Sequence, residues 1–354
     1  MRLLDETVGR IVAQDPASRA AAKSRLDRLT MPHWALGRLM DLAEDLAGMT
    51  RSLRPPVERK AVVVMAGDHG VASEGVSRYP QEVTRQMVCN FVNGGAGINA
   101  LARLAGARVI VIDMGVAGGL EGLAAEGKIL SRRIGPGTRN IALGPAMRRE
   151  DAVRCVEAGI EAALELAPEI DVFATGDMGI ANTTPSSAIV AALTGAPAAE
   201  VTGRGTGIDD ECLRGKIAVV EKVLEVNRPD PKDPLDVLAK VGGFEIGGIA
   251  GLILGAASLR KPVLVDGFIS TAGALIACHL APRATDYMIA AHLSVEMGHR
   301  IALRRLGKKP LLDLDLRLGE GTGAALAMPI VEGAVRVLSE VATFEEAAVS
   351  GADK

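Results

Sequence analysis

The chain has 354 residues, of which 48 % are hydrophobic and 23 % are charged, and its formal net charge at pH 7 is -3. A chain this long and apolar can bury a large core, which excludes a disordered protein, and its interspersed acids and bases exclude a nucleic-acid arm or a membrane-surface patch. Only 2 % of the residues are aromatic but 41 are glycines, so a stacking platform for single strands is absent and close approach of the backbone to a small ligand is favoured.

No stretch of the sequence reaches the roughly 18 uninterrupted apolar residues that a membrane-spanning helix needs. The N-terminal segment "MRLLDETVGRIVAQDP" lacks the positively charged and then apolar plan of a secretory signal. The four cysteines are far apart and show no metal-ligand spacing. We therefore expect a cytoplasmic protein with reduced thiols that binds a small molecule or a second copy of itself.

The first 50 residues predict helices. Apolar residues recur at three- and four-residue spacings in "SRAAAKSRLDRLT" (18–30) and "ALGRLMDLAEDLAGM" (35–49). The segment "RSLRPPVERK" (51–60), with two prolines among charges, then predicts a linker.

Short β-branched runs then alternate with alanine-rich helical stretches. The runs are almost wholly apolar and end at glycine or Asp-Gly, as parallel strands covered on both faces do, and they span 61–67, 108–115, 170–179 and 262–268. This pattern predicts a doubly wound α/β sheet whose ligands lie beyond the carboxyl ends of the strands. Each strand exit carries an aspartate, so one crevice is expected to collect Asp68, Asp113, Asp177 and Asp266. A late period-two segment (311–321) predicts a further strand or an extended arm.

The loop after the first predicted strand begins with Asp68, His69 and Gly70. One interpretation is a loop that holds polar groups over a ligand, and the other is an ordinary turn in which Asp68 caps a helix. No second histidine or cysteine stands at metal-ligand spacing to His69, so a structural histidine is favoured over a metal ligand.

The segment "ATGDMGIANTTPSSAIVAALTG" (174–195) predicts a strand, a glycine turn and a helix. Gly176 and Gly179 would let the backbone approach a ligand, Asn182 can donate a hydrogen bond, and the positive end of the helix would face an anion such as phosphate. The segment matches neither the P-loop nor G-x-G-x-x-G, and the alternative is a tight turn that needs glycine for packing.

Two further glycine-rich segments follow. "VTGRGTGIDDECLRGKIAVV" (201–220) offers Gly203 and Gly205, whose amides can form a nest, and Lys216, which can reach into it, but a phosphate cradle and a surface loop fit this stretch equally well. "VGGFEIGGIAGLILGAA" (241–257) carries small residues at recurring positions, which favours close packing in the core over packing across a dimer interface.

The segment "RLGEGTGAALAMPI" (317–330) places Glu320 between two glycines beside an apolar run. This glutamate is either a surface acid or a proton acceptor in a dry crevice, where burial would raise its pKa from about 4.3 toward neutrality. Arg317 would oppose that rise if it faced the same way, which the sequence leaves open. Pro329 lacks an amide proton and predicts a kink in the following helix or a late start of it.

Together these motifs resemble one family over nearly the whole chain, the nicotinate-nucleotide:dimethylbenzimidazole phosphoribosyltransferases, which make the lower-ligand nucleotide of cobamides. The resemblance lies in "GDHGVASEGVS", "GDMGIANTTPSSA", "KVGGFEIGGIAG", "VDGFISTAGALIA" and, most specifically, "RLGEGTGAALAMPIVEGA". It implies transfer of the phosphoribosyl group of nicotinate mononucleotide to dimethylbenzimidazole or a related azole, with release of nicotinate. It also implies a homodimer with a Rossmann-like large domain and a small helical domain built from both chain ends, and it implies neither a metal nor a cofactor.

The resemblance also implies roles for particular residues. Glu320 matches the glutamate that takes the ring proton of the azole, Lys216 matches the phosphate-binding lysine, and Gly179 matches a glycine whose loop lies against the phosphate. We add the other glycines of the two loops to the phosphate site: Gly176, Gly203 and Gly205. The azole pocket is assigned to Tyr79, Met87, Met178 and Leu318. Secondary candidates are Asp68, His69, Asp177, Asn182 and Asp266.

The chain departs from some relatives at ligand-proximal positions. Asp177 stands where the family carries a glutamate and is one methylene shorter, and Tyr79 and Met87 stand where other members carry small or amide side chains. The changes at Tyr79 and Met87 predict a reshaped azole pocket, and the shorter side chain of Asp177 argues against a direct role for that carboxylate.

We predict three segments along the chain: an N-terminal helical segment (1–59), an α/β large domain (60–310), and a segment with the Glu320 loop and C-terminal helices that join the small domain (311–354). Two alternative functions remain at this point. One is a catalytically silent sensor that binds a nucleotide or a benzimidazole. The other is an NAD-dependent oxidoreductase, which the absence of G-x-G-x-x-G after the first strand disfavours.

Overall fold

A parallel sheet of six strands forms the centre of the protein in this computed structural model, which describes residues 1–205 and 207–350. The strands run in the order β3-β2-β1-β4-β5-β6, and all neighbours are parallel. This is the order of a doubly wound Rossmann sheet, so the predicted α/β class is confirmed. The strands are β1 (Lys60–Gly67), β2 (Ala107–Gly115), β3 (Leu130–Ser131), β4 (Val172–Met178), β5 (Val263–Val265) and β6 (Met288–Ala290).

The four predicted strands overlap β1, β2, β4 and β5. The strands β3 and β6 escaped prediction because they have only two and three residues, too few to show a hydrophobic period. A separate parallel pair is formed by β7 (His292–Ser294) and β8 (Leu312–Leu316). The late alternating segment is therefore a strand and not an extended arm.

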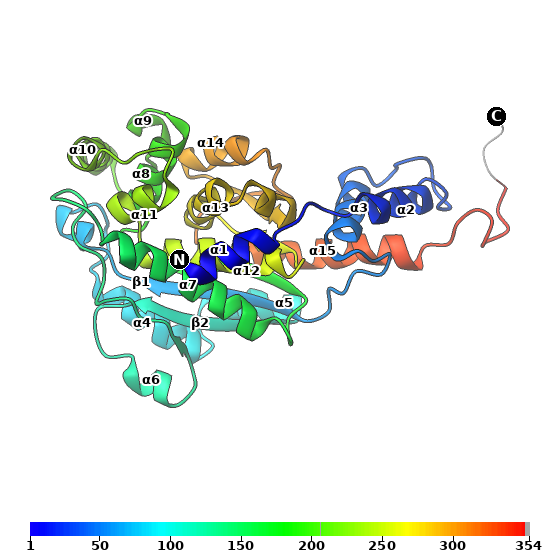
Figure 1. Cartoon of the computed structure of the whole chain (residues 1–354), viewed down its shortest axis with the longest axis horizontal. Coiled ribbons are helices and arrows are strands. Elements are labelled where there is room, and N and C mark those ends of the chain that lie inside the picture. The colour runs from blue at the N-terminus through cyan, green and yellow to red at the C-terminus, as the bar shows by residue number, and fades with distance from the viewer. Residues whose placement is uncertain (206, 351–354) are drawn as a thin grey trace.

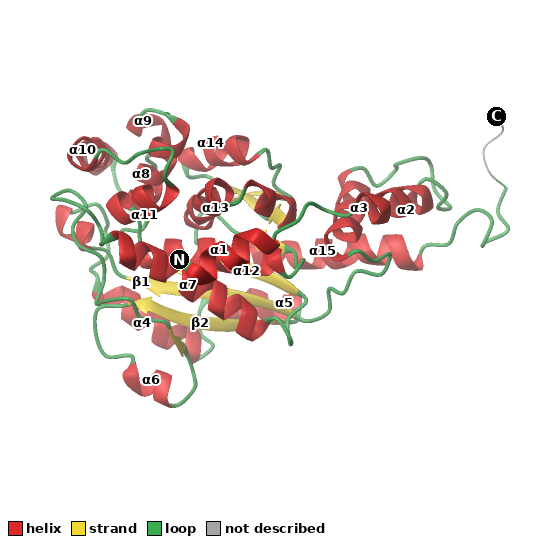
Figure 2. Ribbon diagram, in the orientation of Figure 1, coloured by secondary structure: helices red, strands yellow, loops and turns green. Residues whose placement is uncertain are grey.

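Helices cover both faces of the sheet, as Figure 2 shows with the strands in yellow between red helices. On one face, α12 (Phe244–Ser258) contacts the central strands, and on the other face α4 (Glu82–Val92) and α15 (Thr322–Glu340) do so. The alternation of side chains along β1 explains this sandwich: Val62 lies against the start of α15, whereas Met65 lies against Gly248 of α12.

The remaining elements connect or flank these layers. They are η1 (Gly70–Glu74), α5 (Gly97–Ala105), α6 (Glu121–Ala125), α7 (Arg149–Leu166), α8 (Thr183–Thr194), α9 (Ala198–Val201), α10 (Asp210–Asn227), α11 (Pro234–Val241), α13 (Phe268–Leu280), η2 (Pro282–Tyr287) and α14 (Met297–Leu306).

The small residues of 241–257 pack in the core. A Cβ atom at Gly251 would lie 1.9 Å from the carbonyl oxygen of Val156, and one at Gly159 would lie 2.0 Å from that of Gly248. Helices α7 and α12 therefore touch backbone to backbone, which only glycine permits. Of the two interpretations of this segment, core packing is the one that the structure supports.

A small helical unit is built from both chain ends. The helices α2 (Pro16–Leu26) and α3 (Arg38–Thr50) pack on each other and on α15, and Figure 1 shows them beyond the edge of the sheet, around the far end of α15. The first helix, α1 (Arg2–Arg10), packs instead on α7 and α12. The segment boundaries at residues 59 and 310 stay a prediction.

Helix α15 links the two units. By length and composition it is the one helix in the described part of the chain that could cross a membrane, but 56 % of its apolar window is buried inside the protein. It begins at Thr322 and continues through Pro329, so of the two predicted alternatives the late start is wrong and the kink stays a prediction. The reason is that its N-terminus is held seven residues before the proline by a buried aspartate, described below.

Candidate active site

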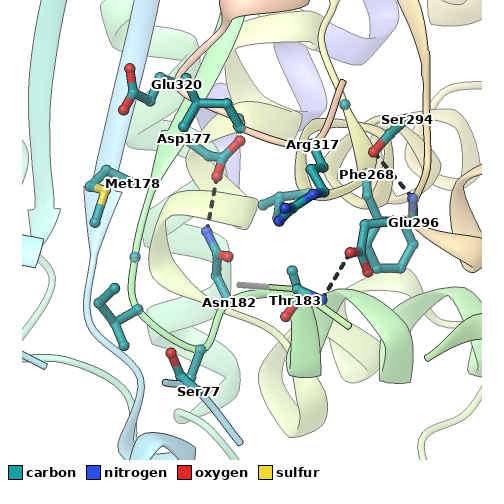
Figure 3. Close-up of a pocket in the computed structure, with 18 of the residues that line it drawn as sticks. Ser77, Asp177, Met178, Asn182, Thr183, Phe268, Ser294, Glu296, Arg317 and Glu320 are labelled. Atoms are coloured by element: carbon teal, nitrogen blue, oxygen red, sulfur yellow. Dashed lines mark hydrogen bonds between the residues drawn. The ribbon is translucent and has the colours of Figure 1, made fainter. Parts of the chain in front are cut away.

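A cavity of about 460 Å³ opens beyond the carboxyl ends of β4 and β5, where a doubly wound sheet binds its ligands. The loops after β1, β4, β5 and β8 supply its walls. Three carboxylates line it in the described part of the chain, namely Asp177, Glu296 and Glu320 (Figure 3).

The loop that carries Glu320 is held in an unusual backbone conformation. Gly319, Glu320 and Gly321 have φ angles of +80°, +61° and +91°, so a glutamate occupies the left-handed region between two glycines. Close packing accounts for Gly176 in β4, because a Cβ there would lie 2.5 Å from the carbonyl oxygen of Glu320. The backbone of the Glu320 loop therefore packs directly against Gly176.

Asp266, at the end of β5, ties this loop to the sheet. Its carboxylate accepts hydrogen bonds from the amides of Gly321 (3.2 Å) and Ala324 (2.9 Å), which caps the start of α15. His292 Nε2 lies 3.6 Å from Asp266 Oδ1, and both side chains are buried. We infer that Asp266 positions Glu320 through the backbone.

The Glu320 carboxylate points toward the N-terminus of α5. Its Oε2 accepts a hydrogen bond of 3.0 Å from the amide of Ile98, and the residue is only 5 % exposed. Burial raises the pKa of Glu320, the Ile98 amide lowers it, and the negative charge of Asp266 raises it further. Figure 3 shows Arg317 extending into the middle of the cavity, away from this carboxylate, so the two side chains diverge.

Of the five predicted phosphate residues, Lys216 and Gly205 lie together beside Thr183, whereas Gly176 packs against the Glu320 loop and not at a phosphate site. Lys216 Nζ donates to Thr183 Oγ1 (2.7 Å) at the N-terminus of α8, and both atoms lie beside Gly205, which has a φ of +51°. Burial lowers the pKa of Lys216 to about 8, and the nearby Glu296 carboxylate opposes that shift. A buried ammonium, a hydroxyl and a helix N-terminus here form a set suited to an anion.

Glu296 is a residue that sequence reasoning missed. Its Oε1 accepts a hydrogen bond of 2.9 Å from the Gly205 amide, and Gly203 packs so closely that a Cβ there would lie 2.1 Å from Oε2. Gly203 and Gly205, both predicted to bind phosphate, thus lie directly against a carboxylate. Glu296 follows the three-residue strand β7, which has no signal of its own in the sequence.

Gly179 packs against the ring of His69, which forms a buried pair with Glu245. A Cβ at Gly179 would lie 2.3 Å from the carbonyl oxygen of Gly67, and His69 Nε2 lies 2.8 Å from Glu245 Oε1 just beneath. His69 and Glu245 are both at most 1 % exposed. The preferred interpretation of His69 as a structural histidine fits this placement. Asp68, also buried, accepts a hydrogen bond from the Ala117 amide (2.6 Å) and lies outside the cavity lining.

The residues assigned to the azole pocket all line the cavity. Met87 and Met178 are half-buried in its wall, whereas Tyr79 and Leu318 are 55 % and 60 % exposed at its mouth. Flat, weakly polar surfaces of this kind suit an aromatic ring. The rings of Phe268 and His292, which also line the cavity, were not predicted.

Asp177 and Asn182 also line the cavity. Asn182 Nδ2 donates to Asp177 Oδ2 (3.0 Å; Figure 3), and Asp177 Oδ1 has no hydrogen-bond partner among the described residues. Burial, followed by the negative charge of Asp266, raises the pKa of Asp177 to about 8. The carboxyl group of Asp177 is therefore largely protonated at neutral pH.

This protonation predicts a pH-dependent effect on stability. Between about pH 4 and pH 8 the folded protein keeps a proton on Asp177 that the unfolded chain has lost, so the residue lowers the free energy of unfolding as the pH rises. We expect Asp177→Asn to be increasingly stabilising, relative to wild type, from pH 5 to pH 8 in thermal unfolding. The control Asp5→Asn, on an exposed position of α1, should show no such trend. A stability difference that stays constant across this range would contradict the assignment.

Comparisons with known proteins find relatives that match this chain over nearly its whole length. A family model described as phosphoribosyltransferase matches residues 11–349. The nicotinate-nucleotide–dimethylbenzimidazole phosphoribosyltransferase of Syntrophotalea carbinolica is 69 % identical over 350 residues, which cover 99 % of both chains. The enzyme of the same name from Geobacter sulfurreducens is 56 % identical over 357 residues, which cover 100 % of both.

A solved structure agrees with the fold. The crystal structure of the enzyme of this name from Thermus thermophilus matches with a TM-score of 0.89 at 49 % identity, over 96 % of this chain and 100 % of that one. The sequence and the fold of the chain thus match the same kind of protein. The chain belongs to the nicotinate-nucleotide:dimethylbenzimidazole phosphoribosyltransferase family.

Proposed function

We propose that the protein transfers the phosphoribosyl group of nicotinate mononucleotide to 5,6-dimethylbenzimidazole or a related azole. The products are nicotinate and the α-ribotide of the azole, its α-riboside 5′-phosphate, which serves as the lower-ligand nucleotide of cobamides. The observation that carries this proposal is one cavity lined by a buried carboxylate, Glu320, and by Thr183, whose hydroxyl accepts a hydrogen bond from the buried ammonium of Lys216 behind the wall. A base and an anion site in one cavity suit an aromatic nucleophile and a nucleotide donor.

In the proposed reaction, one ring nitrogen of the azole attacks the anomeric carbon of the donor. The bond from that carbon to the pyridinium nitrogen breaks, and its electron pair neutralises the ring of nicotinate. Since the leaving ring is already positively charged, it needs little acid assistance. The other azole nitrogen loses its proton, which we assign to Glu320 as general base.

The environment of Glu320 supports that role. A carboxylate in water is a weak base at neutral pH, and burial raises its pKa toward the operating range. The Ile98 amide fixes the orientation of one oxygen and leaves the other available to the azole. Asp266 and Gly176 hold the loop, so the base is positioned before the substrate binds.

Turnover tests the function directly. Purified protein incubated with nicotinate mononucleotide and dimethylbenzimidazole should yield the α-ribotide and one equivalent of nicotinate, resolved by chromatography. Binding of either compound without any product between pH 6 and pH 9 would contradict the proposal and support the sensor instead. Catalysis by an oxidoreductase would require NAD binding, which calorimetry detects.

We also propose that the protein is a homodimer and that it works in the cytoplasm. Apolar side chains near the cavity mouth support an interface, since Val295, Met297, Leu314 and Leu318 are 46–60 % exposed. Light scattering coupled to gel filtration should give twice the chain mass, and a monomeric mass would contradict the dimer.

A further inference from the structure

We propose that Arg317 binds the carboxylate of the nicotinate group and so makes the enzyme prefer an acid over an amide in its leaving group. This inference rests on the proposed function, because it names how that site selects its phosphoribosyl donor. The donor carries two anionic groups, a phosphate and a carboxylate, and Lys216 with Thr183 accounts for only one of them.

Arg317 is the one arginine or lysine among the described residues that line the cavity. The other ionisable groups in the lining are three carboxyl groups, His292 and the phenol of Tyr79, none of which carries a permanent positive charge. Within the described part of the chain, the guanidinium of Arg317 makes no hydrogen bond or ion pair, and it lies near Gly207, where a Cβ would be 3.8 Å from Nη1. A guanidinium that lines a ligand cavity without a protein partner is available to a ligand carboxylate, which it can bind through two parallel hydrogen bonds.

The loop geometry fits a displacement reaction. Arg317 and Glu320 leave the same short loop but diverge, since Glu320 reaches the amide of Ile98 and Arg317 extends into the middle of the cavity (Figure 3). In a displacement with inversion, the nucleophile and the leaving group lie on opposite sides of the reacting carbon. One loop therefore presents a base to the nucleophile and a cation to the leaving group.

Charge development makes this contact catalytic as well as selective. In the substrate the nicotinate unit is a zwitterion, with a positive ring and a negative carboxylate. As the glycosidic bond breaks, the ring becomes neutral and the unit becomes an anion. The attraction of the Arg317 guanidinium to this unit therefore grows toward the transition state, so its loss should lower kcat and not only raise KM.

The alternative ligand for Arg317 is the phosphate of the donor, because Gly207 belongs to the same loop as Gly205. The two assignments differ in one measurable respect. A carboxylate contact is lost when nicotinate is replaced by nicotinamide, whereas a phosphate contact is not. The experiment therefore compares Arg317→Gln with wild type toward ligands that carry one anionic group or the other.

We expect Arg317→Gln to lower kcat/KM for nicotinate mononucleotide by roughly 10- to 100-fold, the effect of losing hydrogen bonds between charged groups. The inhibition constant of nicotinate as a product inhibitor should rise by a similar factor. The inhibition constants of nicotinamide and of ribose 5-phosphate should change by less than about threefold, and kcat/KM for nicotinamide mononucleotide should be nearly unaffected. Arg317→Lys, which keeps the charge without the planar fork, should recover part of the nicotinate effect.

Arg336→Gln is the matched control, because this arginine is 61 % exposed on α15 and should leave all these constants unchanged. Weakened inhibition by ribose 5-phosphate with unchanged inhibition by nicotinate would assign Arg317 to the phosphate and overturn the proposal. Equal losses with the acid and amide donors would overturn it as well. Absence of turnover in the wild type would instead contradict the proposed function, and nicotinate binding measured by calorimetry would still test Arg317.

Discussion

Replacing Glu320 by glutamine is expected to lower turnover by about 10²- to 10⁴-fold, which is the usual contribution of a general base. Glutamine has nearly the same shape and can still meet the Ile98 amide with its oxygen, but it cannot accept the azole proton. The loop itself depends on Gly176, Gly321 and Asp266, all unchanged in this variant. The circular dichroism spectrum and melting temperature should therefore stay close to those of wild type.

The pH profile provides a second readout of the same variant. Burial raises the pKa of Glu320, and only the ionised form accepts a proton, so wild-type kcat/KM should fall as the pH drops through that raised pKa. Glu320→Gln should lack this acid limb. Glu340 is 63 % exposed on α15, so the control Glu340→Gln should retain both the wild-type activity and the fall of kcat/KM at low pH. A Glu320→Gln enzyme within threefold of wild type would remove this residue from the mechanism.

The sequence predicted the parts of the fold whose patterns are long. The strands β1, β2 and β4 have seven to nine residues, long enough for an apolar run that ends at a glycine to be visible in the sequence. The strands β3, β5, β6 and β7 have two or three residues and depend on pairing with a neighbour, which is a tertiary effect. Only β5 among them was found, because its exit carries Asp266 and Gly267.

The site was partly predictable for a related reason. Residues at or just after the end of a visible strand, such as Asp177 and Asn182, were placed by the rule that ligands lie at the carboxyl ends of strands. Glu296 and Phe268 were missed, since Glu296 follows β7 and Phe268 resembles any core aromatic at the start of a helix. The packing of Gly176 on Glu320 could not be foreseen either, because it joins segments 144 residues apart that only the folded chain brings together.

Replacing Lys216 by methionine is expected to raise KM for nicotinate mononucleotide by roughly 10- to 100-fold, with a smaller effect on kcat. Lys216 is 1 % exposed and its ammonium donates to Thr183 at the end of α8, so the phosphate would lose its buried cation. Methionine fills a similar volume without a charge, and removing a buried charge in favour of an apolar side chain need not destabilise a protein. The variant should therefore fold normally.

The pH dependence of this step has the opposite sign to that of Glu320. Burial lowers the pKa of Lys216 to about 8, so in the free enzyme the ammonium loses its proton as the pH rises past that value. Wild-type kcat/KM for the donor should then decline on the alkaline side, and Lys216→Met should lack this decline. Lys222→Met, at an exposed position of the same helix α10, is the matched control and should keep the wild-type KM and profile. An unchanged KM in Lys216→Met would exclude this lysine from the phosphate site and leave Thr183 and the helix N-terminus to bind the anion.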